Sequence, residues 1–217
     1  MDVSPQNVIR LFGNVWITDT VISTWVMMIL IVAGAIALRR RRPTALEMVL
    51  DFVVDMVSDV MGERPADQYL PFLGSLLLFI AIANFVGVIP GLVTPTRDIS
   101  TALALALVVF FAVHYYGIKE KGVLQYLKDL AAPLYLLPLT LPLEIIGQVS
   151  RTLSLTLRLF GNILSSELVV AVIISLVPLF VHFPMLGLGI FTGVLQAYIF
   201  TMLATVYISS AVEETNY

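Results

Sequence analysis

A long stretch without any charged residue, from Gln68 to Thr96, sets the fold class. An α-helix rises about 1.5 Å per residue, so roughly 20 apolar residues cross the ~30 Å hydrocarbon layer of a bilayer. Of all 217 residues, 59% are hydrophobic and only 12% are charged, and the mean hydropathy is +0.97. The composition predicts an integral membrane protein and excludes a soluble domain.

Similar apolar segments recur along the chain, and together they predict an all-α integral membrane protein with a single membrane domain. We expect five membrane-crossing helices and one amphipathic surface helix. At over 30 residues, the fourth crossing is longer than a perpendicular passage requires, so the last two helices are expected to be long and strongly tilted. No hydrophilic region is large enough to host catalysis, so no enzyme is expected. The crossings are predicted over 20–38, 68–93, 99–118, 143–176 and 185–212, and the surface helix over 44–61.

Two clusters of basic residues predict the orientation in the membrane. Arginines fill positions 39–42 after the first crossing, and Lys119, Lys121 and Lys128 follow the third. Basic loops stay in the cytoplasm, so the N-terminus is expected outside and the C-terminus inside. Residues 1–17 are too polar to cross, and we expect a surface helix or a loose arm there. They lack a basic region followed by a cleavage site, so no cleaved signal peptide is expected.

The predicted surface helix carries an acidic stripe. Glu47, Asp51, Asp55 and Asp59 recur every four residues among apolar side chains. Such an amphipathic helix lies along a membrane face or against another subunit, and a solvated face without a special role is the alternative.

Arg158 places a charge inside the apolar run from Ser154 to Asn162, in the fourth predicted crossing. A charge at the bilayer centre costs about 2.5 to 3.5 kcal/mol on insertion scales. The guanidinium cannot escape by losing its proton. Arg158 therefore needs a partner or a function that offsets this cost, unless it only reaches a headgroup layer or closes a structural ion pair.

Helical geometry indicates where the partner of Arg158 comes from. Glu144, Arg151 and Arg158 are spaced by seven residues and share one face, but Glu144 lies about 21 Å from Arg158 along the axis. Glu167 lies about 180° around the helix and roughly 13 Å further along it. Neither acid can reach Arg158 on this helix. We expect the carboxylate to come from another chain, unless a loop acid such as Asp98 reaches in.

The polar residues of the last two helices predict two wet pockets on either side of Arg158. A fixed positive charge between them bars a cation from passing straight through. The inner pocket would be lined by Glu144, Gln148, Ser150 and Ser154, and the outer one by Asn162, Glu167 and Gln196.

The residues from Leu155 to Asn162, followed by Glu167, resemble subunit a of the F-type ATP synthase. Further matching segments are 95–98, 116–122, 195–200 and 206–208. The resemblance implies an ion-translocating stator subunit whose two half-channels face a rotating ring of c subunits, each with an ionisable carboxylate. It also implies peripheral-stalk b subunits and membrane lipid as partners, and a bacterial inner membrane as the location. No nucleic acid, metal or cofactor is expected.

The resemblance also assigns roles to single residues. Arg158 matches the essential arginine that attracts the c-subunit carboxylate and blocks a short circuit. Glu167, Asn162 and Gln196 match the outer half-channel, while Glu144 and Ser154 match the inner access route. Gln148 and Arg151 complete the candidate site.

Two departures from the family pattern leave questions open. Some relatives carry a histidine that partners the acid at 167, but this chain has Gly189 there, so Glu167 works alone or with His182. The short N-terminal segment resembles the compact, often sodium-translocating branch. Because the c subunit binds the ion, this chain does not decide between proton and sodium.

Two other function classes are alternatives for a membrane chain of this kind. A free-standing secondary transporter of a small anion would use Arg151 and Arg158 as ligands, but it predicts inverted repeats, which the sequence does not show. A purely structural membrane anchor would have no use for embedded charges. Because cysteine is absent, disulfides, thiolate metal sites and cysteine nucleophiles are excluded.

Overall fold

The computed structural model describes residues 7–12, 15–39, 44–62, 66–87, 94–130, 137–176 and 182–213. Within these ranges the chain is helical apart from one short antiparallel hairpin. The hairpin consists of β1 (Asn7–Phe12) and β2 (Val15–Thr18). The helices are α1 (Asp19–Arg39), α2 (Thr44–Met61), α3 (Leu70–Val86), α4 (Ile99–Lys121), α5 (Val123–Leu130), α6 (Leu137–Leu176) and α7 (His182–Val212), with 3₁₀ turns η1 (Ala66–Gln68) and η2 (Pro95–Arg97).

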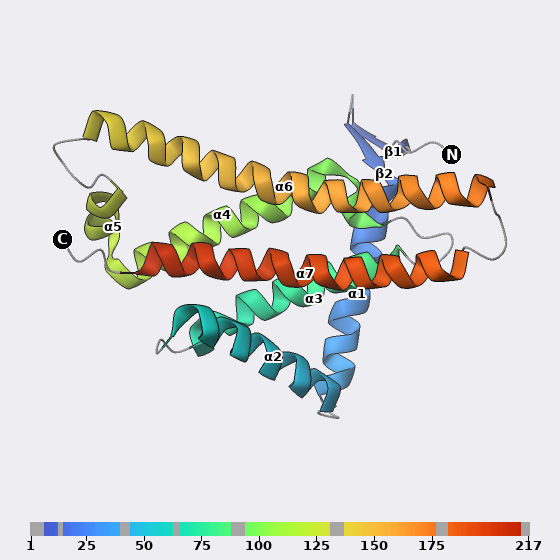
Figure 1. Cartoon of the computed structure of the whole chain (residues 1–217), viewed down its shortest axis with the longest axis horizontal. Coiled ribbons are helices and arrows are strands. Elements are labelled where there is room, and N and C mark those ends of the chain that lie inside the picture. The colour runs from blue at the N-terminus through green and yellow to red at the C-terminus, as the bar shows by residue number, and fades with distance from the viewer. Residues whose placement is uncertain are drawn as a thin grey trace.

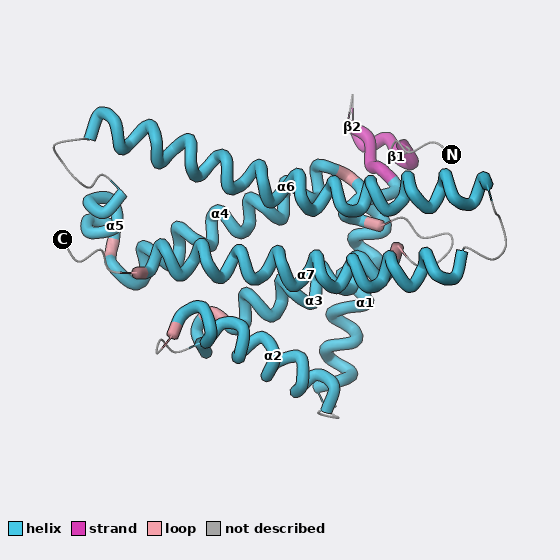
Figure 2. The backbone as a smooth tube through the Cα atoms, viewed as in Figure 1, coloured by secondary structure: helices cyan, strands magenta, loops and turns pink. Residues whose placement is uncertain are grey.

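The two longest helices, α6 and α7, lie side by side in opposite directions along the long axis of the molecule (Figure 1). Helix α4 packs against both of them, and α3 and α2 pack against α7. Helix α1 crosses the direction of the long pair steeply in the same view, next to the hairpin. Figure 2 shows that helices make up nearly all of the described chain.

Small side chains make α4 the centre of the bundle. Ala102, Ala106, Val109, Val113 and Gly117 are buried along one face of this helix. Such a stripe lets neighbouring helices approach closely, which is how membrane helices gain van der Waals contact. The other helices contribute larger core side chains to this centre, among them Val57, Leu73, Ile80, Leu155, Leu159, Phe200 and Ile208.

Three of the described helices are long and apolar enough to cross a membrane by length and composition. They are α4, residues Pro138–Ile173 of α6, and Pro184–Val212 of α7. Shorter apolar segments lie in α1, at Ser23–Gly34, and in α3, at Leu70–Val86. A helical, multi-pass membrane protein is therefore confirmed.

Helix α6 begins six residues before the predicted start at 143, because prolines interrupt it less than expected. Pro138 falls at the second position of α6 and Pro142 inside it. A proline in the first turn loses no hydrogen bond, since the first N–H groups of a helix have no partner within it. Pro184 similarly falls near the start of α7, which begins at His182 and not at 185.

Two short elements differ from the sequence-based expectation. The helix or loose arm expected over 1–17 is wrong for the described part, which forms the hairpin β1/β2. Its signal is the Gly13-Asn14 pair between two runs rich in β-branched residues, a typical hairpin pattern. Helix α5, between the third and fourth predicted crossings, was not predicted. The last residues of the predicted 68–93 crossing, 88–93, lie outside the described chain.

Helix α2 packs one face on the bundle and exposes the other. Val53 and Val57 are fully buried, and Phe52 contacts Tyr198 of α7 with ring centroids 5.7 Å apart. The acidic stripe of α2, Glu47, Asp51, Asp55 and Asp59, is exposed.

Candidate functional site

Arg158 lies near the middle of α6 and is exposed on the outside of the bundle. Among the described residues it has no hydrogen bond or ion pair. Its neighbours on the same face are small: Ser154 and Ser165 are exposed, and a Cβ at Gly161 would meet nothing within 4 Å. The guanidinium is therefore presented outward, on a surface that another helix can approach closely.

At the start of α4, the turn η2 places an arginine against Glu167 of α6. The Nε atom of Arg97 lies 3.1 Å from Oε2 of Glu167, and the two side chains are 21% and 33% exposed. From the sequence, Glu167 was expected to work alone or with His182, whose side chain lies outside the described part of the chain. In the sequence, Arg97 appears only within the matching segment 95–98, so sequence reasoning missed it as the partner of Glu167. Its signal is a single cation in a short loop between two crossings.

The neighbouring loop acid, Asp98, does not approach Arg158 as the alternative required. Its Oδ1 accepts a hydrogen bond from Ser100 N over 2.9 Å and caps α4. This arrangement satisfies a free N–H group at the helix start.

A second polar contact holds η2 in place beside the Arg97–Glu167 pair. Asn84 Nδ2 of α3 donates to the carbonyl oxygen of Gly193 in α7 over 2.9 Å, and Thr96 Oγ1 donates to Asn84 Oδ1 over 3.3 Å. These side chains connect α3, η2 and α7. Together with Arg97 and Glu167 they form the Arg97-end cluster: Asn84, Thr96, Arg97 and Glu167.

Two further candidate residues lie on the long helices α6 and α7. Asn162 is half-buried on α6. Gln196 of α7 is only 5% exposed, and its Nε2 has no hydrogen-bond partner among the described residues. Buried amides without a partner are rare, so this donor indicates a place where a water molecule is expected.

The opposite end of the bundle holds a second set of polar side chains. Gln148 Nε2 donates to Glu144 Oε1 over 3.2 Å, and the guanidinium carbon of Arg151 lies 5.6 Å from the ring centroid of Tyr207. Beside them is a cavity of about 20 Å³, enough for a water molecule. Its walls are Ala106, Val109, Phe110, Val113, Gln148, Arg151, Thr152, Leu155 and Tyr207. Ser154 is exposed and does not line it.

Helix α5 adds a tyrosine to this second set. Tyr126 is buried, and its ring packs so tightly on Gly117 that a Cβ there would lie 2.6 Å from it. Its side chain lies near those of Gln148 and Glu144. Burial raises the pKa of Tyr126, and the charge of Glu144 raises it further. Sequence reasoning missed Tyr126 because it missed α5. We call Tyr126, Glu144, Gln148, Arg151 and Tyr207 the Lys121-end cluster.

His114 is partly buried and packs against Phe110 and Tyr126. Its Nδ1 lies 2.8 Å from the carbonyl oxygen of Phe110, and its ring centroid lies 4.4 Å from that of Phe110 and 5.9 Å from that of Tyr126. No group of three or more potential metal ligands occurs among the described residues.

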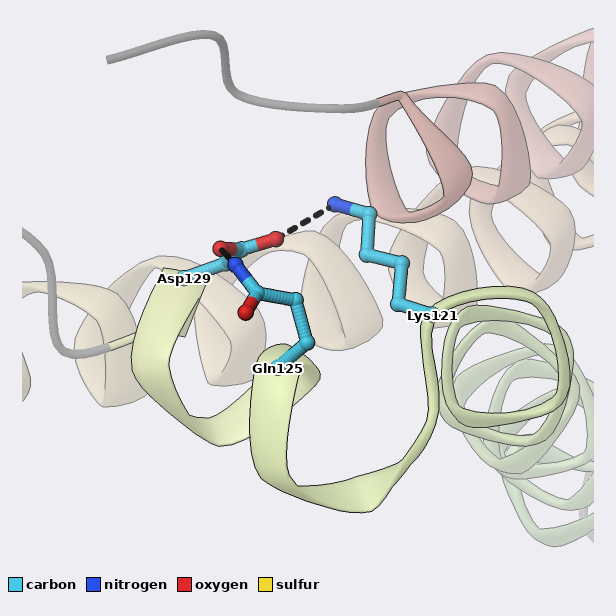
Figure 3. Close-up of polar contacts among 3 residues, drawn as sticks. All are labelled: Lys121, Gln125 and Asp129. Carbon is cyan, nitrogen blue, oxygen red and sulfur yellow. Dashed lines mark hydrogen bonds and ion pairs between the residues drawn. The ribbon is translucent and has the colours of Figure 1, made fainter.

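A polar clamp attaches α5 to the end of α4 (Figure 3). Lys121 Nζ donates to Asp129 Oδ2 over 2.9 Å, and Gln125 Nε2 donates to Asp129 Oδ1 over 2.9 Å. The hydrogen bond from Lys121 holds the pKa of Asp129 below its usual range. The clamp fixes the helix that carries Tyr126.

Fold and site together define a multi-pass helical membrane protein with polar clusters at the two ends of a long helix pair and an arginine presented outward between them. The family model described as ATP synthase A chain matches residues 15–209. ATP synthase subunit a 2 of a Picosynechococcus species is 44% identical, covering 97% of this chain and 93% of its own length. The subunit a 2 of a Bradyrhizobium species is 42% identical, covering 98% and 97%. ATP synthase subunit a of Nitrosospira multiformis is 39% identical, covering 100% and 88%.

The chain belongs to the ATP synthase A chain family, which confirms the resemblance. Membership makes it the ion-translocating stator subunit of an ATP synthase, a membrane subunit that does not itself carry the ATP chemistry. These relatives give no support to a free-standing anion transporter.

Proposed function

We propose that this chain forms two half-channels against the ring of c subunits, with Arg158 between them, so that ion flow turns the ring and drives ATP synthesis. The observation that carries the proposal is the exposure of Arg158 in mid-helix without a charged partner among the described residues. An unpaired guanidinium in lipid is unfavourable by several kcal/mol. A carboxylate on each passing c subunit supplies the missing partner.

Arg158 acts through its permanent charge. It attracts an ionised c-subunit carboxylate and favours release of that carboxylate's ion toward one half-channel. The same charge prevents a cation from passing directly between the half-channels. The small side chains at Ser154, Gly161 and Ser165 leave room for the approaching helix.

The two clusters supply the half-channels. The Arg97-end cluster, with Asn162, Glu167 and Gln196, belongs to the outer half-channel, and the unpaired amide of Gln196 is a binding partner for water there. The inner half-channel uses Glu144, Gln148, Arg151 and Ser154, and the cavity beside Gln148 and Arg151 supports it.

The topology that fits this role has five crossings, by α1, α3, α4, α6 and α7, and α2 on the surface. The N-terminus is outside, the C-terminus is cytoplasmic, and the membrane is the bacterial inner membrane. In Figure 1, α1 passes steeply behind the α6–α7 pair, and this steep angle supports strong tilt of the pair. Peripheral-stalk b subunits hold the chain against rotation, and lipid covers its other apolar surfaces.

The coupling ion is a proton or sodium. One elementary charge moved through 100 mV yields about 2.3 kcal/mol, so several ions are needed for each ATP. A ring that binds one ion per c subunit meets this requirement.

The test is ATP-driven ion uptake into vesicles that contain the assembled complex, with acidification and radioactive sodium followed in parallel. Arg158→Ala is expected to abolish uptake and leave assembly intact. Lys119→Ala, which removes an exposed cation in the last turn of α4, is the matched control and keeps uptake. Normal coupled uptake in Arg158→Ala would overturn the proposal.

A further inference from the structure

We propose that Arg97 is a positioning residue for ion translocation: by pairing with Glu167 it favours the ionised form of that acid and orients it in the outer half-channel, and transport depends on this pair. The inference rests on the proposed function, because it assigns Glu167 to the ion pathway.

The geometry of the pair favours a strong interaction. The Nε–Oε2 distance of 3.1 Å is that of a close ion pair, and Arg97 Nε is inaccessible to water. Both side chains are mostly buried, so water screens their attraction less than it screens a surface ion pair. The pair also joins residues from distant parts of the chain, the turn before α4 and the second half of α6.

The backbone of η2 fixes Arg97 in this position. Arg97 N donates to the carbonyl oxygen of Thr94 over 3.1 Å. Thr94 and Thr96 are buried on either side of Pro95, and Thr96 also donates to Asn84. Asp98 begins α4 as its N-cap. The turn is therefore held to α3 and α4, and the guanidinium is held to α6.

The elements packed around Glu167 offer few other charged groups. On the α4 side, Asp98 accepts from Ser100 N and carries the same sign of charge. On α7, Gly189 has no side chain, and the side chain of His182 lies outside the described chain. Arg158 lies nine positions away on α6, on the opposite side of that helix. Of the described side chains, Arg97 is the one that forms an ion pair with Glu167.

The pair suits an acid that must receive and pass on an ion repeatedly. The guanidinium keeps its charge at any accessible pH, so it favours the carboxylate each time the ion leaves. Without that charge, a mostly buried carboxyl group loses its stabilised ionised form and its fixed orientation. Arg97 acts through Glu167 and needs no contact with the ion.

A set of four variants of the assembled complex tests this role through ATP-driven ion uptake into vesicles. Arg97→Gln is expected to lower uptake about tenfold, because the mostly buried carboxylate of Glu167 loses its ion-pair partner. Arg97→Lys keeps most of the uptake because it keeps the charge. The double variant Arg97→Gln/Glu167→Gln is expected to be no worse than Glu167→Gln alone, because both changes remove the same pair.

A chemical rescue separates charge from structure, since the chain contains no cysteine of its own. In Arg97→Cys, a thiosulfonate reagent that adds an ethylammonium group is expected to restore uptake, whereas a neutral reagent of equal size is not. Equal rescue by both reagents overturns the proposal, and so does uptake within twofold of normal in Arg97→Gln. The variant Arg158→Ala keeps the two proposals apart. Normal uptake in Arg158→Ala overturns the proposed function. Loss of uptake in Arg158→Ala together with normal uptake in Arg97→Gln overturns this inference alone.

Discussion

Asn84 and Gly193 hold α3 against α7 at a point where only glycine leaves enough room. Asn84 Nδ2 donates to the carbonyl oxygen of Gly193 over 2.9 Å, and a Cβ at position 193 would lie 2.9 Å from Asn84 Cβ. Gly193 lies one turn before Gln196 on α7. This contact therefore sets where the buried amide of Gln196 lies relative to η2 and the Arg97-end cluster.

Gly193→Ala is expected to destabilise the subunit, because the added methyl group meets the Cβ of Asn84 rather than a flexible side-chain end. Overpacking of this kind costs about 1–3 kcal/mol. The measurement is the temperature at which the purified complex loses this subunit. Gly189→Ala is the matched control on the same helix, because a Cβ there meets nothing within 4 Å. Equal temperatures for the two variants would contradict the close contact.

Gly117→Ala is expected to displace Tyr126 and expose the cavity at the Lys121 end. A Cβ at 117 would lie 2.6 Å from the Tyr126 ring and 3.3 Å from a backbone oxygen of α7, so the ring is the part that moves. A cysteine at Thr152, which lines the cavity, is then expected to react several-fold faster with a small polar thiol reagent. Gly147→Ala, in open space on α6, is the control and leaves the rate unchanged. An unchanged rate in Gly117→Ala would show that Tyr126 does not cover the cavity.

The sequence predicts the long elements of this fold well because their signals are local. Long apolar runs give the long helices, and the four-residue spacing of acids gives α2. The short elements depend on weaker signals. Helix α5 has eight residues, and an isolated helix of that length is marginal in water, so contacts such as Lys121–Asp129 decide whether it forms.

The candidate site is predictable where one helix carries it and unpredictable where several elements meet. Arg158 faces outward, and no described residue of its own helix pairs with it, as periodicity indicates. The partner of Glu167 comes from η2, and no spacing rule relates Arg97 to a residue so far along the chain. Tyr126 reaches Gln148 only through the fold of α5.

The clamp between Lys121 and Asp129 makes the attachment of α5 dependent on pH in the acid range. The hydrogen bond from Lys121 lowers the pKa of Asp129 in the folded state, so the carboxylate contributes stability above the ordinary aspartate pKa. That stability is lost as the pH falls below about 4, toward the lowered pKa. Near neutral pH, no dependence on pH is expected from this pair.

A fluorescent label on a cysteine at the exposed Leu124 position reports the release of α5 as increased mobility. Asp129→Asn removes the carboxylate and is expected to show increased mobility already at neutral pH, with no further change on acidification. Glu120→Gln, an exposed acid near the clamp, is the control and keeps the acid transition. An acid transition that persists in Asp129→Asn would assign it to another group.

The buried amide of Gln196 is expected to lower the stability of the subunit in the complex, although ion uptake requires this amide. Its Nε2 is buried without a partner among the described residues, and such a group costs about 1–3 kcal/mol. Gln196→Leu is therefore expected to raise the temperature at which the complex loses the subunit, while ion uptake falls, because the pathway loses its polar group.

Thr201→Val is the matched control for Gln196→Leu. The Thr201 hydroxyl is also buried on α7 without a partner in the described chain, and its replacement is expected to raise stability and leave uptake intact. Loss of uptake in both variants would assign the effect to packing of α7, and unchanged uptake in Gln196→Leu would remove Gln196 from the ion pathway.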